Sequence, residues 1–303
     1  MPLTSEPKLI TGNANKPLAQ AIARRMSLHR GVNVGLVDTR VERFNDGEIF
    51  VEVFENVRGE DMFIIQSTSN PANDNLMELL IMADALRRSS ASRVTAVLPY
   101  FGYARQDRKD EGRTPITAKL VANLITAAGA DRVLALDLHA AQIQGFFDIP
   151  VDHMSASPVL LKHISESRDE LDPLCVVSPD PGNVKAAGVV ANALDADFAI
   201  IDKRRKSGSD VSSENIIGDV SGKNVLMVDD MISTAGTICE AAKLVKKHGA
   251  KKIVVAATHA VLVGLAMERI AEAPIDRIVV TDTIPCGNRC DAIADKLTEL
   301  TVA

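Results

Sequence analysis

Short aliphatic runs alternate with helical patterns along almost the whole chain. Most runs lack the polar alternation of a half-exposed strand, as expected for strands buried on both faces. The segments between them have the period of amphipathic helices and predict βαβ units, hence an α/β fold of mostly parallel sheets flanked by helices. We predict strands over Met62–Gln66, Val94–Pro99, Val133–Asp137, Cys175–Ser178, Phe198–Asp202, Val225–Val228, Ile253–Thr258 and Arg277–Thr281. The predicted helices include Asn75–Ser89, Ile116–Ala128, Val184–Leu194 and Ile238–His248.

The length of the chain predicts two domains. Its 303 residues exceed one typical small domain. Hydrophobic residues make up 46% of the chain but aromatic residues only 3%, so the cores must be mostly aliphatic, which suits parallel sheets. Proline and small polar residues interrupt the pattern near Asp152–Pro158. We therefore predict one domain over residues 1–153 and another over residues 154–303.

Charge and composition argue against several classes of protein. The net charge of −6 argues against nucleic acid as a main partner. The N-terminal residues lack the basic and apolar regions of a signal peptide, and no apolar run is long enough to cross a bilayer. We expect a cytoplasmic protein with no membrane partner. The four cysteines are too few for a disulfide framework, and Cys286 and Cys290 lack the second ligand pair of a zinc site.

The most specific chemical pattern follows the predicted strand Val225–Val228. Two carboxylates come first, then a turn of small and hydroxyl residues, then a helical pattern near Ile238. The residues are Asp229, Asp230, Ser233, Thr234, Ala235, Gly236 and Thr237. Backbone N–H groups at a helix start suit a phosphate, and carboxylates suit hydroxyls or a metal. An ordinary capped helix after a turn would use similar residues, but the full run favours a sugar phosphate.

Polar residues also follow other predicted strands. Arg105 and Gln106 come after one, His139 after the next, and Asp180 after a third. Arginine can hold phosphate with two parallel hydrogen bonds, and Mg²⁺ binds one or two protein groups together with substrate phosphates. Taken singly, these residues also fit a surface ion pair, a structural histidine and a turn aspartate.

Two further segments have two readings each. Lys203–Lys206 is a basic cluster before a Ser/Gly-rich stretch, which suits either closure over polyphosphate or an ordinary solvated surface. Val32–Val53 reads as extended strands, and Phe44–Glu48 within it contains Asp46-Gly47, a hairpin-turn pair. Its aromatic ring and carboxylates could also hold a purine, and the residues alone leave both readings open.

Taken together, these segments resemble the ribose-phosphate pyrophosphokinases, also called 5-phosphoribosyl diphosphate (PRPP) synthetases. The other segments that carry the resemblance are Asn56–Gly59, Asn73–Leu79, Pro99–Arg108, Pro115–Lys119, Asp137–Asp148, Ile201–Arg205 and Thr283–Pro285. The resemblance implies two type I phosphoribosyltransferase-like domains. It also implies a Mg²⁺-dependent transfer of the diphosphoryl group of ATP to the 1-hydroxyl of ribose 5-phosphate, giving PRPP and AMP. A homohexamer or another dimer-based homo-oligomer is expected, with the turn at Phe44–Glu48 supplied by a neighbouring subunit.

The resemblance also implies a role for each matched residue. ATP would be bound by Phe44, stacking on adenine, and by Asp46, Gly47, Glu48, Arg105 and Gln106. The magnesium sites would use His139 and Asp180, and the catalytic loop Lys203 and Arg205. Ribose 5-phosphate would be bound by Arg205, Asp229, Asp230, Ser233, Thr234, Ala235, Gly236 and Thr237.

Ser233, Asn183 and Ala186 depart from the family pattern, and two other functions compete. Ser233 stands where the family commonly has Asp, so we expect altered affinity and retained activity. A nucleobase phosphoribosyltransferase would share the loop at 229–237 but would not explain Phe44–Glu48 or His139. A non-catalytic regulatory paralogue would tend to lose the catalytic loop, whereas Lys203 and Arg205 remain.

Overall fold

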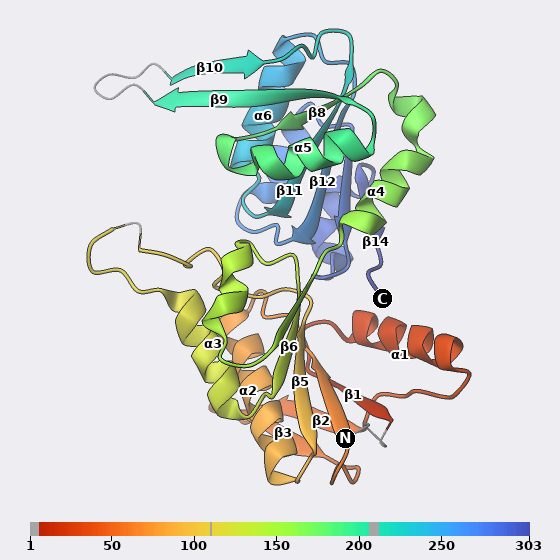
Figure 1. The fold of residues 1–303 in the computed structure, drawn as a ribbon, viewed down its shortest axis with the longest axis vertical. Helices are drawn as coiled ribbons and strands as arrows, with labels where there is room; N and C mark the ends of the chain where they lie inside the picture. Colours follow the sequence, from red (N-terminus) through yellow and green to blue (C-terminus); the bar gives the residue numbers. More distant parts are fainter. Residues whose placement is uncertain (1–5, 110, 206–211) are drawn as a thin grey trace. The chain divides into compact units, whose positions relative to one another are not determined.

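The chain forms two compact α/β units in the computed structural model, which describes residues 6–109, 111–205 and 212–303 (Figure 1). The first unit comprises Met1–Ser155 together with Thr283–Pro285 and Val302–Ala303. The second comprises Ala156–Asp282 and Cys286–Thr301. Each unit builds its own apolar core on both faces of a central sheet.

The first unit is built on a five-stranded sheet whose strand order follows the chain. All neighbouring strands are parallel. In order across the sheet they are β1 (Pro7–Thr11), β4 (Asp61–Ile65), β5 (Arg93–Leu98), β6 (Arg132–Leu136) and β7 (Val151–Met154). The helices are α1 (Lys16–Arg30), α2 (Ala72–Arg88), α3 (Thr117–Ala128) and the short 3₁₀ helix η1 (Ala141–Phe146).

Helices cover both faces of this sheet because successive strand residues point to opposite sides. Met62 and Ile64 of β4 face the core formed with α2 and α3. Phe63 and Ile65 of the same strand face α1 instead. Burial on both faces explains why β4 shows no polar alternation.

A separate hairpin lies against the α2 side of the first unit. Its strands β2 (Thr39–Arg43) and β3 (Ile49–Val53) pair antiparallel with each other. Val41, Val51 and Val53 pack against the core under α2 and α3. The hairpin confirms the extended segment and turn that the sequence predicts around Asp46-Gly47, and Gly47 has the positive φ of +94° that this turn requires.

The second unit is built on a seven-stranded sheet. All neighbouring strands are parallel except β10, which is antiparallel to β9. In order across the sheet they are β10 (Ser212–Ile217), β9 (Asp197–Arg205), β8 (Leu174–Ser178), β11 (Asn224–Ile232), β12 (Ile253–Ala260), β13 (Arg277–Thr281) and β14 (Leu297–Leu300). The β9–β10 hairpin extends beyond the neighbouring helices of this unit (Figure 1).

Helices cover both faces of this second sheet. One core contains residues of α4 and α5, and the other contains residues of α6 and α7. The helices are α4 (Ser157–Glu166), α5 (Val184–Ala193), α6 (Gly236–Lys247) and α7 (Ala266–Glu272). The 3₁₀ helices are η2 (Arg168–Leu171), η3 (Pro181–Asn183) and η4 (Gly287–Ile293).

The predicted fold class is confirmed, with differences at strand ends and sheet edges. Each strand and helix predicted from the sequence is present, within a few residues of its predicted ends except for two strands that run further. β11 continues to Ile232 because it remains paired with β12 as far as Ala260, so Asp229 and Asp230 lie within the strand rather than after it. Similarly, β9 continues to Arg205 because β10 pairs with it.

Two further expectations concern the whole chain. The four cysteines are buried and free, as expected for a chain without a disulfide framework. Among the residues that the structure describes, no helix is both long and apolar enough to cross a membrane.

Candidate active site

The strand order of the second unit reverses between β8 and β11. From β8 the chain moves to β9 on one side, and it later returns as β11 on the other side of β8. Such a reversal in an open α/β sheet leaves a crevice at the carboxyl ends of the strands, where ligands bind. Asp180 follows β8, and Asp229 and Asp230 lie in the last part of β11. The structure therefore brings these three predicted site residues to the same switch point.

The carboxylates at this switch point act on one another. Partial burial raises the pKa of Asp229 to about 8, with further contributions from Asp230 and Asp180. The Asp229 carboxylate accepts a hydrogen bond from the Asp230 backbone N–H at 2.9 Å. The ionised form of Asp229 is therefore disfavoured in the protein alone. A cation, or hydroxyl groups donating to the carboxylates, would stabilise that form.

The segment after β8 is tied to β11 beside the acidic pair. Asp180 Oδ1 accepts a hydrogen bond from the Asn183 N–H at 3.0 Å and so caps η3. The Asn183 side-chain amide donates to the carbonyl of Val228, the residue before Asp229. These bonds fix Asp180 relative to the carboxylates of β11.

The turn after β11 leads into a helix start that suits an anion. Ala235, at the N-cap of α6, has a left-handed backbone with φ +59°. The Ala235 side chain makes no capping hydrogen bond, and Thr234 and Thr237 are exposed. The Arg269 guanidinium donates to the Thr234 carbonyl at 2.8 Å and holds the turn. The N–H groups at this helix start and the hydroxyls of Thr234 and Thr237 together suit a phosphate, and we call residues 233–237 the phosphate-cradle turn.

In the first unit, three predicted site residues follow the carboxyl ends of two adjacent strands. Arg105 and Gln106 follow β5, and His139 follows the adjacent parallel strand β6. Gln106 Oε1 accepts a hydrogen bond from Thr117 Oγ1 at 2.5 Å, which anchors this loop to the start of α3. A 2.9 Å bond from Gln142 Nε2 to Asp107 Oδ2 joins the loops that follow β5 and β6.

The hairpin turn in the first unit is compatible with both readings that the sequence left open. The Phe44 N–H donates to the Glu48 carbonyl at 2.8 Å, and Asp46 Oδ1 accepts from the Glu48 N–H at 3.1 Å. The turn is thus a well-bonded hairpin. Its Phe44 ring is 54% exposed and rests edge-on against Phe50, with centroids 5.4 Å apart, so it can also offer a face to a ligand.

The predicted residues divide between the two units. Those from Phe44 to His139 lie in the first unit, and Asp180 and the residues of 229–237 lie in the second. Lys203 and Arg205 belong to the backbone of β9, but their side chains lie outside the described residues, as does the whole of Lys206.

The donor set of the second unit fits magnesium. Within the described residues, no group of three or more His, Cys, Asp and Glu side chains could hold a metal ion unaided. Magnesium does not require such a cage, because it keeps waters and takes one or two carboxylates with substrate phosphates. The hard oxygen donors of Asp180, Asp229 and Asp230 match that preference, and their mutual repulsion would be relieved by a cation.

Sequence reasoning missed Arg269, which contacts the phosphate-cradle turn. It lies in α7 and meets Thr234 across 35 residues of sequence. No motif surrounds it, so no local signal in the sequence points to this contact.

Comparison with known proteins identifies the family. Residues 7–129 match the N-terminal domain of ribose phosphate pyrophosphokinase, and residues 210–297 match the phosphoribosyl synthetase-associated domain. This chain belongs to the ribose-phosphate pyrophosphokinase family. The Cereibacter sphaeroides ribose-phosphate pyrophosphokinase is 60% identical over 92% of this chain and 84% of its own. The Rhodopirellula baltica ribose-phosphate pyrophosphokinase is 54% identical over 98% of this chain and 92% of its own.

A solved structure of the family shares the fold. The phosphoribosylpyrophosphate synthetase from Mycobacterium smegmatis superposes with a TM-score of 0.90 and is 43% identical. The match covers 98% of this chain and 95% of that chain. The family resemblance inferred from the sequence motifs is therefore confirmed.

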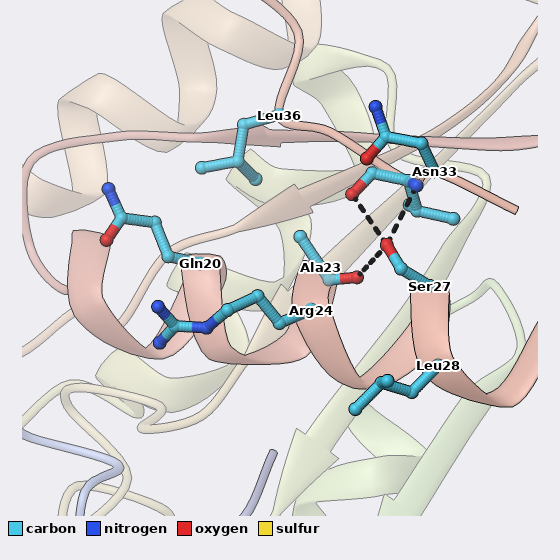
Figure 2. A pocket seen from close by; sticks show the side chains of 8 residues that line it. Gln20, Ala23, Arg24, Ser27, Leu28, Asn33 and Leu36 are labelled. Carbon is cyan, nitrogen blue, oxygen red and sulfur yellow. Dashed lines mark hydrogen bonds between the residues drawn. The ribbon is translucent and has the colours of Figure 1, made fainter.

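A groove beside α1 contains none of the predicted site residues in its lining (Figure 2). Its volume is about 640 Å³. Ser27 closes one side, because its Oγ accepts a hydrogen bond from the Val34 N–H at 2.9 Å and lies 2.8 Å from the Ala23 carbonyl. The lining residues are Gln20, Ala23, Arg24, Ser27, Leu28, Asn33, Val34 and Leu36.

Proposed function

We propose that this protein transfers the diphosphoryl group of ATP to the 1-hydroxyl of ribose 5-phosphate, forming PRPP and AMP with Mg²⁺. The observation that carries the proposal is the switch point of the second unit. There the carboxylates of Asp229 and Asp230 lie on the strand that leads, through one short turn, to the start of α6. A ribose phosphate needs acceptors for hydroxyls and donors for a phosphate, and this segment supplies both. The relatives named ribose-phosphate pyrophosphokinase support the same activity.

The second unit would bind ribose 5-phosphate. Asp229 and Asp230 would accept hydrogen bonds from the ribose hydroxyls. The turn would hold the 5-phosphate through Ser233, Thr234, Ala235, Gly236 and Thr237. With the sugar held at both ends, the oxygen of the 1-hydroxyl attacks the β-phosphorus of ATP. The bond from that phosphorus to the α-phosphate oxygen breaks, AMP leaves with that oxygen, and the hydroxyl proton passes to solvent water. Positioning supplies much of the rate gain in such a transfer.

The first unit would supply ATP contacts. Phe44 would stack on adenine, with further contacts from Asp46, Gly47, Glu48, Arg105 and Gln106. His139 and Asp180 would serve the magnesium sites. When bound, Mg²⁺ offsets the charge of the polyphosphate and of the developing transition state.

Lys203 and Arg205 would stabilise the transition state more than the substrates, with Arg205 also contacting ribose 5-phosphate. Replacing either residue with Ala should then lower kcat far more than it raises KM. Steady-state kinetics at varied ATP and ribose 5-phosphate measure both terms. A change confined to KM would contradict the catalytic role.

The proposal includes a homo-oligomer in the cytoplasm, either a homohexamer or another dimer-based assembly. The turn at Phe44–Glu48 would reach the ATP site of a neighbouring subunit. The exposure of the Phe44 ring supports a role outside the core of its own unit.

A direct assay tests the activity. The purified protein is incubated with ATP, Mg²⁺ and ribose 5-phosphate, and the release of AMP and the formation of PRPP are followed. Omitting ribose 5-phosphate should abolish AMP release. No cleavage of ATP in this mixture, together with nucleotide formation in a separate incubation of PRPP with a nucleobase, would indicate a phosphoribosyltransferase instead. An inactive homo-oligomer that activates an added synthetase would indicate a regulatory paralogue.

A further inference from the structure

The turn assigned to ATP is carried by a hairpin outside the main sheet of its unit. β2 and β3 form a two-stranded sheet of their own. Such a hairpin is only marginally stable in water unless it docks on something else. Val41, Val51 and Val53 provide apolar docking. Apolar packing is non-directional, so it buries the inner face without fixing where the tip of the hairpin points.

An ion pair joins the tip of the hairpin to the start of α2. Arg43, the residue before Phe44, places Nη2 2.9 Å from Asp74 Oδ2 in the first turn of that helix. Asp74 raises the pKa of the Arg43 guanidinium through this hydrogen bond, and the charge of Glu78 adds to the effect. Exposed pairs of this kind contribute little to global stability. The pair therefore serves to orient the hairpin and not to stabilise the whole protein, because it ties one end of the hairpin to the start of α2.

A second connection starts one helical turn further along α2. Glu78 is only 4% exposed, and its carboxylate accepts 2.8 Å hydrogen bonds from the Asn13 N–H, from Asn13 Nδ2 and from Gln66 Nε2. Asn13 Nδ2 also lies 3.2 Å from the Val41 carbonyl in β2. A buried carboxylate with three donors is a rigid anchor. Through Asn13, that anchor reaches the backbone of the hairpin.

We propose that Asp74 and Glu78 are positioning residues, which hold the β2–β3 hairpin through Arg43 and Asn13 and thereby set the affinity for ATP. The inference rests on the proposed function, because it takes Phe44–Glu48 as the turn that binds ATP. A displacement of about 1 Å in a binding group is enough to weaken a site by a large factor. None of the four residues is assigned to the reacting atoms, so the effect falls on ATP binding and not on the chemical step.

The principal test is Arg43→Met, which keeps most of the aliphatic stem and removes the charge. We expect KM for ATP to rise about tenfold, with kcat and KM for ribose 5-phosphate within about twofold of wild type. Arg43→Lys should restore most of the ATP affinity, because Lys keeps the charge but not the planar fork. Arg88→Met is the matched control: it removes the exposed 2.7 Å pair with Asp84 on the same helix and should change no kinetic constant.

A second variant tests the other connection. Asn13→Ala removes the bonds from Asn13 Nδ2 to the Val41 carbonyl and to the Glu78 carboxylate, while leaving the Arg43–Asp74 pair in place. KM for ATP should rise by about threefold, a smaller effect than that of Arg43→Met because one of two connections remains. Thermal unfolding of every variant accompanies the kinetics.

The outcomes separate this inference from the proposed function. An unchanged KM for ATP in Arg43→Met, together with a raised one in Phe44→Ala, would overturn the positioning role and leave the activity and the ATP turn standing. An unchanged KM for ATP in Phe44→Ala would refute the assignment of the turn itself. A uniform loss of kcat and of both affinities, with a lower Tm, would also overturn the inference, because it would show a merely structural role.

Discussion

The two units build a ligand site from a parallel sheet in different ways. In the second unit, one continuous segment from Asp229 to Thr237 contains the carboxylates, the turn and the helix start, and the strand order reverses beside it. In the first unit the strand order follows the chain, and the predicted ATP residues come from a hairpin and a separate loop after β5. The comparison teaches that the predicted continuous site is encoded locally, whereas the predicted dispersed site would depend on side-chain connections such as Arg43–Asp74.

The largest expected effect comes from removing a charge in the continuous site. Asp230→Asn should lower kcat/KM for ribose 5-phosphate roughly 100-fold, or about 2.7 kcal/mol, because a charge-assisted hydrogen bond to the sugar is lost. Steady-state kinetics measure it, with Asp295→Asn as a control at an exposed carboxylate of the same unit. Equal kinetic constants for Asp230→Asn and wild type would show that the pair does not hold the sugar.

The next effect concerns the dispersed site of the first unit. A Cβ at Gly102 would overlap the Thr68 carbonyl oxygen, at the point where the Gly102 N–H donates to Thr68 Oγ1 at 2.6 Å. Gly102→Ala should therefore lower the free energy of unfolding by about 2 kcal/mol and raise KM for ATP, since the Arg105 loop follows directly. Urea denaturation and kinetics measure both.

Gly145→Ala is the control for Gly102→Ala, because its Cβ would meet no described atom within 4 Å. This control should change the free energy of unfolding by less than about 0.5 kcal/mol. If Gly102→Ala behaves like the control, the backbone around Thr68 accommodates a methyl group and the loop is not held by this contact.

A pH-dependent effect is expected in the continuous site. The pKa of Asp229 rises from 3.8 to about 8 on folding, so between these values the native state keeps a proton that the unfolded state has released. The free energy of unfolding should therefore fall as pH rises across this window. Asp229→Asn, which cannot ionise at this position, should not show that decrease. At pH 8.5 without divalent cations, the variant should be more stable by roughly 1–2 kcal/mol, a modest value because Asp229 is partly exposed to solvent.

Urea denaturation at several pH values, with and without Mg²⁺, measures this effect. Bound Mg²⁺ should favour the ionised carboxylate and flatten the pH dependence of the wild type. If the free energy of unfolding depends on pH with the same slope in the wild type and in Asp229→Asn, the raised pKa of Asp229 would be contradicted.

The smallest expected effect tests whether each unit binds a different substrate. Thr237→Val removes an exposed hydroxyl at the start of α6 and should raise KM for ribose 5-phosphate about fivefold, with KM for ATP unchanged. Phe44→Ala should show the reverse pattern, with only KM for ATP raised. If both variants alter both constants alike, the division of substrates between the units is wrong.

The sequence predicted the interior of both sheets but missed their edges. The strands without a predicted counterpart are β1, β7, β10 and β14, and these form the outer edges of the two sheets. Central strands are buried on both faces and show continuous apolar runs. An edge strand has a neighbour on one side only, so polar sequences such as Leu297–Leu300 are tolerated there. Their pairing comes from the adjacent strand and not from their own pattern.

Candidate site residues that are consecutive in the chain could be predicted from the sequence, whereas residues that meet only through tertiary contacts could not. The loop at 229–237 was fully visible in the sequence, because its carboxylates, turn and helix start are consecutive. Glu78 and Arg269 were not assigned any function, since their contacts with Asn13 and Thr234 span 65 and 35 residues. Side chains that meet across such separations leave no periodic signal along the chain.

By itself, the sequence determined the fold class, the family and the loop from Asp229 to Thr237, because aliphatic runs and consecutive motif residues act over a few positions. Only the tertiary structure decided that Asp180 and Asp229 share a reversal of strand order, and that burial, with further contributions from Asp230 and Asp180, raises the pKa of Asp229. Likewise, only the structure connected the hairpin of Phe44 to α2. The physical reason is the same in both cases: these interactions depend on distances through space that the order of residues does not specify.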